Sequence, residues 1–140
     1  MNCSLIICTY NWPEALSFVL ASVAQQSELP DEIIIADDGS DDLTSKVISN
    51  FSKTFSKPII HSWQEDLGCR ISHSRNRAIA KSRFEYIIMI DGDTVLHHDF
   101  IKDHKRFSQR GIYIQGSRVL LQEEFTKNLF QKNIFLKPSL

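Results

Sequence analysis

The sequence alternates short apolar runs with longer segments in which apolar residues recur every three or four positions. A run of four to six apolar residues suits a strand buried on both faces, whereas the longer period suits an amphipathic helix. The predicted strands are 5–8, 33–36, 58–63, 86–90 and a last one at 112–114 that resumes at 119–121 after an interruption. Strands that alternate with helices indicate an α/β fold, with a mostly parallel sheet flanked by helices.

Helices are expected after each of the first four strands. Asn11 is expected to cap the first helix, with Pro13 in its first turn and Glu14 completing a capping box. The buried face of this helix is predicted to consist of Leu16, Val19, Leu20 and Val23. The next helix face is predicted from Leu43, Val47, Ile48, Phe51 and Phe55, and further helices are expected through 74–80 and around 100–107.

The composition fits one packed domain. The chain has 140 residues, 42% of them hydrophobic, and a formal net charge of -1, which argues against disorder and against binding to a nucleic-acid backbone. Cys3, Cys8 and Cys69 lack the spacing of a zinc site, and their odd number suits reduced thiols. With no signal peptide or membrane-spanning run in the sequence, we expect a cytoplasmic protein.

Polar residues follow three of the predicted strands, at Thr9-Tyr10-Asn11, Asp37-Asp38 and Asp91-Gly92-Asp93. The carboxyl ends of parallel strands meet at one edge of a sheet, where ligands usually bind. Two nearby carboxylates can hold a hard cation, although Asp-Gly-Asp is also common in turns and acidic residues often cap helices. Arg75 belongs to a basic cluster that suits either a solvated helix face or contact with a phosphate.

Four segments together carry a family resemblance: 4–11, 35–40, 74–78 and 90–93, which read SLIICTYN, IADDGS, SRNRA and IDGD. In this order they resemble family 2 glycosyltransferases of the GT-A fold, over residues 4 to 121. The segments 63–66 and 115–121 are similar to bacterial members that build polysaccharides or lipopolysaccharide cores, including chondroitin-polymerase-like domains. The resemblance implies a GT-A, Rossmann-like sheet at residues 1–121.

The resemblance also implies a ligand and roles for individual residues. The donor would be a nucleotide-diphosphate sugar, most often a UDP-sugar, bound with Mn²⁺ or Mg²⁺. By position in the motifs, the residues that border the nucleotide would be Thr9, Tyr10 and Asn11, with Asp38 accepting a hydrogen bond from the base, and Arg75 and Asn76 near the base and diphosphate. In the Asp-x-Asp motif, Asp91 would face the ribose beside the metal, and Asp93 would ligate it.

Family members usually carry an acceptor half with a carboxylate general base, well downstream of the Asp-x-Asp motif. Because only 47 residues follow Asp93, we expect a donor-binding half that stops before the acceptor half, with the base beyond Leu140. The acceptor would be a saccharide or a lipid-linked molecule. The alternative is a catalytically incomplete module that binds a nucleotide sugar or associates with another chain.

Residues 122–140 form a basic amphipathic stretch. Its apolar residues are Phe125, Leu129, Phe130, Ile134 and Phe135, and its basic residues include Lys127, Lys132 and Lys137. One interpretation is a helix that docks on the sheet. The others are a surface for a downstream half, for a second subunit in self-association, or for peripheral contact with the inner face of the membrane.

A different enzyme class shares one motif. The loop that begins at Asp91 is similar to the Asp-x-Asp-x-Thr loop of haloacid-dehalogenase-type phosphatases, where the first aspartate is a nucleophile and the second, here Asp93, an acid-base group. In that family the loop follows the first strand, whereas here it follows the fourth predicted strand. The order of elements therefore argues against a phosphatase.

Overall fold

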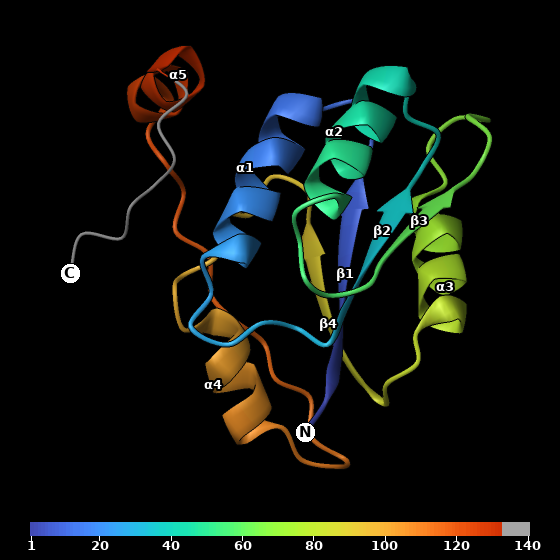
Figure 1. Ribbon diagram of the computed structural model, residues 1–140, viewed down its shortest axis with the longest axis vertical. Helices are drawn as coiled ribbons and strands as arrows, with labels where there is room; N and C mark the ends of the chain where they lie inside the picture. Colours follow the sequence, from blue (N-terminus) through green and yellow to red (C-terminus); the bar gives the residue numbers. More distant parts are fainter. Residues whose placement is uncertain (133–140) are drawn as a thin grey trace.

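The computed structural model describes residues 1–132 and contains a four-stranded parallel sheet with the strand order β3-β2-β1-β4 (Figure 1). The strands are β1 (Cys3–Thr9), β2 (Glu32–Asp37), β3 (Ile59–Trp63) and β4 (Tyr86–Asp91). Between and after them lie α1 (Pro13–Ala24), α2 (Asp42–Ser52), α3 (Ile71–Lys81), α4 (Phe100–Phe107) and α5 (Glu123–Lys132). The prediction of a parallel α/β sheet flanked by helices is confirmed.

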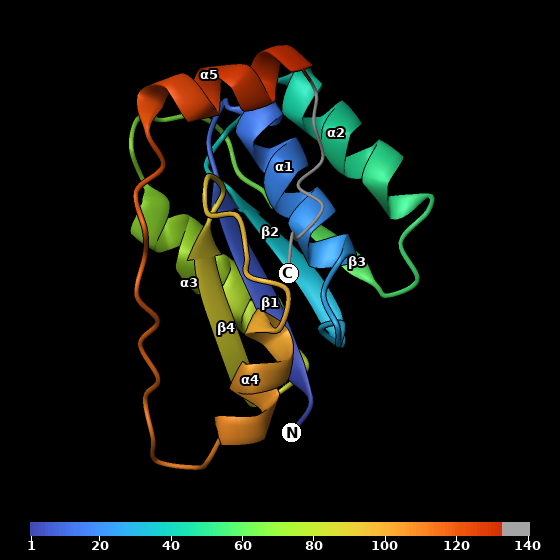
Figure 2. The same ribbon diagram turned by 90° about the vertical axis from the view of Figure 1, so that its left-hand side faces the viewer.

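The helices cover the two faces of the sheet unequally. The α1, α2 and α4 helices pack on one face, and α3 packs on the other (Figures 1 and 2). Alternating residues of β1 explain this division, since Leu5 and Ile7 belong to the larger apolar cluster and Ile6 and Cys8 to the smaller one. The predicted apolar face of α1 is buried in the larger cluster as expected.

The β4 strand is less covered than its apolar sequence predicts. Ile88 and Ile90 are buried against the larger cluster, but Met89 is 38% exposed. The reason is the position of α3, which contacts β1, β2 and β3, while β4 lies at the edge of the described sheet. Expecting both faces of β4 to be covered was therefore wrong for the face that carries Met89.

The predicted strand at 112–114 and 119–121 is absent from the described structure. Residues 112–122 form an irregular segment that leads from α4 to α5 (Figure 2). Tyr113, Val119 and Leu120 are 85%, 88% and 92% exposed. β-Propensity expresses packing on a sheet rather than an intrinsic backbone preference, so an apolar segment without a paired neighbour need not form a strand.

The start of α1 also differs from the prediction. Trp12 occupies the N-cap without a side-chain hydrogen bond, and Asn11 has a left-handed backbone with φ 46°. Asn11 instead bonds to the loop before α2: its Oδ1 accepts from the Asp41 N–H at 2.8 Å, and its own N–H donates to Ser40 Oγ at 2.9 Å. The asparagine therefore joins two loops, and α1 relies on Pro13 at its first turn.

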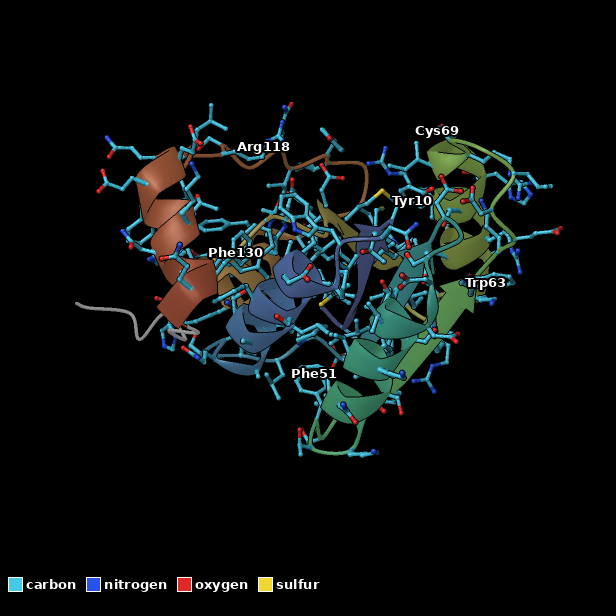
Figure 3. The ribbon with its side chains drawn as sticks, turned by 90° about the horizontal axis from the view of Figure 1, so that it is seen from above. Tyr10, Phe51, Trp63, Cys69, Arg118 and Phe130 are labelled. Atoms are coloured by element: carbon cyan, nitrogen blue, oxygen red, sulfur yellow. The ribbon has the colours of Figure 1, made fainter. Side chains whose placement is uncertain are left out.

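The α5 helix lies beside α1, on the side away from α2 (Figures 1 and 3). Phe130 packs on Phe18 and Trp12, with ring centroids 5.3 and 6.2 Å away, and Leu129 is buried. A helix forms in this stretch, as in one of the interpretations of the sequence, but its ring contacts are with Trp12 and with Phe18 of α1 and not with the sheet. Ile134, Phe135 and Lys137 of the predicted tail lie outside the described residues. No helix within residues 1–132 is long and apolar enough to cross a membrane.

Candidate functional site

A cavity of about 330 Å³ lies at the carboxyl edge of the sheet, where β1, β2 and β4 end and α3 begins. Figure 3 looks toward this edge: Tyr10 and Cys69 lie at the cavity, and Arg118 comes from the segment that leads to α5. The cavity is lined by Cys8, Thr9, Tyr10, Trp12, Asp38, Gly68, Cys69, Ile71, Asp91, Gly92 and Asp93. The predicted meeting of the strand ends is therefore present.

Backbone hydrogen bonds tie the three strand ends together. The Asp38 N–H donates to the Thr9 carbonyl at 3.1 Å, and the Gly92 N–H donates to the Cys8 carbonyl at 2.7 Å. Gly92 has no room for a side chain, because a Cβ there would lie 2.7 Å from that same Cys8 oxygen. Glycine thus allows the chain to turn closely over β1, with an aspartate on each side of the turn.

Asp38 is buried at the rim of the cavity, 5% exposed, and its carboxylate already accepts two hydrogen bonds. Gln64 Nε2 donates to Oδ1 at 2.6 Å, and the Arg70 backbone N–H donates to Oδ2 at 2.8 Å. An ionised carboxylate has about four acceptor positions, so two remain for a ligand. This aspartate can therefore accept a hydrogen bond from a ligand N–H or O–H.

Asp37 does not line the cavity but supports the loop that carries Asp38. It is fully buried, and its Oδ1 accepts from the backbone N–H groups of Gly39 and Ser40. His61 Nε2 lies 2.7 Å from its Oδ2. Burial opposes the charged form, but the hydrogen bonds from His61 and Ser40 outweigh it and hold the pKa of Asp37 below its ordinary value.

Asp91, at the end of β4, is joined to two arginines. Arg75 Nη2 of α3 lies 2.9 Å from Oδ1, and Arg118 Nη1 lies 3.7 Å from Oδ2. Arg75 Nε also donates to Cys8 Sγ at 3.3 Å. Burial raises the pKa of the Cys8 thiol despite this cation, so the thiol is a poor nucleophile. Arg75 is thus joined to the edge of the site through Asp91, and its contact with a phosphate stays a prediction.

The carboxylates of Asp91 and Asp93 suit a hard divalent cation. Asp93 is exposed, and within residues 1–132 no three His, Cys, Asp or Glu side chains gather in a cluster that could hold a metal. Mg²⁺, and Mn²⁺ by the same oxygen chemistry, is commonly held by one or two carboxylates, with waters and substrate phosphates as the other ligands. The pair therefore fits a metal that arrives with a diphosphate.

Tyr10 is the aromatic residue of the predicted nucleotide loop. Its hydroxyl donates to Asp66 Oδ2 at 3.0 Å, and this bond raises the pKa of Tyr10, so the phenol keeps its proton. Gly39, with φ 100°, approaches the same loop so closely that a Cβ would lie 2.6 Å from Asp66 Cα. The loop after β3 is thus anchored beside the loops after β1 and β2.

The structure separates the predicted site residues into two groups. The cavity is lined by Thr9, Tyr10, Asp38, Asp91 and Asp93. Within the described residues, Asn11, Arg75 and Asn76 do not line it: Asn11 bridges two loops, Arg75 reaches Asp91, and Asn76 is exposed on α3.

Sequence reasoning missed the contribution of the loop after β3. Gly68, Cys69 and Ile71 line the cavity, and Gln64 bonds to Asp38. Trp12 was missed as well, because its neighbour Asn11 offered a simpler role as a helix cap. The sequence did hold a signal for this loop, because the loop follows a predicted parallel strand and must therefore lie at the same edge of the sheet as the acidic loops.

The chain is similar to known sugar-transferring enzymes. A family model described as glycosyl transferase family 2 matches residues 4–138. Poly-beta-1,6-N-acetyl-D-glucosamine synthase of Staphylococcus epidermidis is 28% identical over 120 residues, which cover 83% of this chain and 28% of the synthase. The chain thus spans well under half of that relative.

Two solved structures share the fold. TarS 1–349 of S. aureus in complex with UDP has a TM-score of 0.63 at 24% identity, covering 76% of this chain and 32% of that one. The mannosyltransferase PcManGT of Pyrobaculum calidifontis, in complex with GDP-Man and Mn²⁺, has a TM-score of 0.56 at 21% identity, covering 66% and 27%. The sheet is therefore that of the GT-A glycosyltransferases, and the chain belongs to glycosyl transferase family 2.

Proposed function

We propose that this chain binds a nucleotide-diphosphate sugar in the cavity at the carboxyl edge of the sheet, as the donor for glycosyl transfer in polysaccharide or lipopolysaccharide synthesis. The observation that carries the proposal is the gathering of Asp38, Asp91 and Asp93 from three separate loops around one cavity. A UDP-sugar is the favoured donor, since the structural relative TarS has been solved with UDP.

Each part of the donor has a partner in this arrangement. Asp38 accepts from the base, and Thr9 and Tyr10 border the nucleotide. Asp91 and Asp93 hold Mn²⁺ or Mg²⁺, and Asp91 also faces the ribose. A divalent cation bound there would neutralise charge on the departing diphosphate. Arg75, 2.9 Å from Asp91, orients that carboxylate and adds positive charge beside the diphosphate.

The transfer is a substitution at the anomeric carbon of the sugar. An acceptor hydroxyl oxygen forms a bond to this carbon, while the bond to the phosphate oxygen breaks and its electron pair leaves with the diphosphate. The hydroxyl proton passes to a carboxylate general base. Asp38, Asp91 and Asp93 are the carboxylates that line the described cavity, and all three have roles in donor binding. The base is therefore expected outside this set of three carboxylates.

The second candidate is a module that binds a nucleotide sugar without transferring it. It is favoured by the lining of the cavity, because its three carboxylates, Asp38, Asp91 and Asp93, are all assigned to the donor in this proposal and none is left to act as the general base. Both candidates require nucleotide binding, so binding is tested first and turnover second.

The first experiment is thermal unfolding of the chain with UDP, GDP, CDP or ADP, each with and without Mn²⁺. A ligand at about 100 times its dissociation constant stabilises the folded state by roughly 2.7 kcal/mol, which is a measurable shift in Tm. We expect UDP with Mn²⁺ to give the largest shift. If no nucleotide shifts the Tm, the proposal is wrong. Release of UDP from UDP-sugars, with and without saccharide acceptors, then separates the transferase from the binding module.

A further inference from the structure

A buried amide connects Asp38 to a histidine on α3. Gln64 is 3% exposed and follows β3, with its backbone N–H on the Asp37 carbonyl at 3.2 Å. Its Nε2 donates to Asp38 Oδ1 at 2.6 Å and makes a longer bond to the Arg70 carbonyl at 3.4 Å. Its Oε1 lies 2.7 Å from Nδ1 of His73. Every polar atom of this side chain therefore has a partner.

The hydrogen bonds in this chain of residues can run in only one direction. The Asp38 carboxylate accepts from Gln64 and from the Arg70 backbone, and in its ionised form it can only accept. The amide nitrogen of Gln64 must therefore face Asp38, which directs Oε1 toward His73. His73 must then carry its proton on Nδ1 and donate it. If the amide were turned around, two oxygens would face each other in a buried position.

This arrangement fixes both the position and the hydrogen-bonding character of Asp38. Donors hold both of its oxygens, from Gln64 on one and from the loop before α3 on the other. Because Asp38 also lines the cavity, the acceptor positions that remain on its carboxylate are available to a ligand. A group held by its neighbours in this way needs little rearrangement when a ligand arrives.

We propose that Gln64 and His73 are positioning residues that keep Asp38 as a fixed acceptor and so select the nucleobase of the donor. A base with an N–H at the edge that meets Asp38, such as N3–H of uracil or N1–H of guanine, donates to it. Cytosine and adenine present a ring nitrogen lone pair at the equivalent place, which the carboxylate repels. The inference rests on the proposed donor cavity and adds the residues that decide which base enters it.

The test compares base preference between variants, because the ratio of two dissociation constants does not change when a variant is merely less stable. Titration calorimetry with Mn²⁺ would measure UDP, CDP, GDP and ADP. The variants are Gln64→Leu, which removes the amide at similar size, and His73→Phe, which removes Nδ1 at an exposed position. His98→Phe is the matched control, an exposed histidine that does not line the cavity.

We expect the unmodified chain to bind UDP at least about tenfold more tightly than CDP, as a hydrogen bond to a charged group implies. His73→Phe and Gln64→Leu should each reduce this ratio about fivefold or more, chiefly by weakening UDP, while His98→Phe keeps it. The affinities for GDP and ADP show whether the base that donates its N–H to Asp38 is uracil or guanine. An unchanged ratio in a folded His73→Phe variant overturns the inference even if Gln64→Leu does not fold. If the unmodified chain binds none of the four nucleotides, the proposed function itself is contradicted.

Discussion

Arg75 and Asp91 form an ion pair across the sheet edge, with Nη2 of the arginine 2.9 Å from Oδ1 of the aspartate. The arginine lies on α3 and the aspartate ends β4, so the pair joins an element on one face of the sheet to the acidic loop over its end. The side chains of Arg75 and Asp91 are 34% and 44% exposed to solvent, so the ion pair adds little to the stability of the fold. Because the ion pair lies beside the cavity, its effect is best measured as a change in nucleotide affinity.

Replacing Arg75 with Met should weaken UDP binding about five- to tenfold, because Asp91 loses its orienting partner and the diphosphate loses a nearby cation. The free energy of unfolding should change by only about 0–1 kcal/mol. Calorimetry and urea unfolding would measure the two effects. Arg77→Met on the same helix is the control, and an equal loss of affinity there would mean that only net charge matters.

Asp93→Ala should abolish the Mn²⁺-dependent part of nucleotide binding. Asp93 is exposed, so its removal should leave the Tm nearly unchanged. The measurement is UDP affinity with and without Mn²⁺, beside Asp103→Ala as an exposed carboxylate on α4. Undiminished Mn²⁺-dependent binding in Asp93→Ala would remove this residue from the metal site.

Gly92→Ala should destabilise the fold by about 1–3 kcal/mol, since a Cβ would lie 2.7 Å from the backbone oxygen of Cys8. Gly116→Ala is a matched control, because the nearest atom to its Cβ would be 3.9 Å away. Urea unfolding of the two variants would show the difference. Equal stability of both would mean that the turn between Asp91 and Asp93 can relax.

Asp37 should contribute to the loss of stability in acid. Its folded pKa is lowered by hydrogen bonds from His61 and Ser40 that overcome the effect of burial. The contribution of Asp37 to the free energy of unfolding is therefore fully present above the ordinary carboxyl pKa of about 4. It is lost as the pH falls below that value and through the lower pKa that Asp37 has in the folded state.

Asp37→Asn should thus be less stable than the unmodified chain near neutral pH, by about 1–3 kcal/mol, and should lose less stability below pH 4. Urea unfolding at a series of pH values would measure this. Asp42→Asn changes an exposed carboxyl at the start of α2 and serves as the control. If the free energy of unfolding falls as steeply with decreasing pH in Asp37→Asn as in the unmodified chain, Asp37 does not contribute to the loss of stability in acid.

Phe130→Ala should lower the free energy of unfolding by about 1–2 kcal/mol, because it removes the ring contacts of α5 with Trp12 and Phe18. Phe107→Ala, at a ring that is 62% exposed, should cost less. Because Trp12 also lines the cavity, UDP affinity should be measured in both variants. If the two variants are equally stable, α5 is not docked on α1 in solution.

The sequence alone determined the parallel sheet, the buried face of α1 and the three loops that meet at the cavity. These features follow from local patterns, since apolar runs form buried strands, an apolar stripe forms a packed helix face, and parallel strands end at one edge. Acidic residues directly after buried strands stand out without any knowledge of contacts, and of these Asp38, Asp91 and Asp93 line the cavity, whereas Asp37 does not.

Only the tertiary structure decided which residues support those loops. Asn11 bonds to the loop before α2 and not to its own helix, Gln64 reaches Asp38 across 26 positions, and the apolar segment 112–121 forms no strand. Each outcome depends on a partner distant in sequence. A polar side chain bonds to whichever groups the packed core brings near it, and an apolar segment becomes a strand only where a neighbouring strand pairs with its backbone.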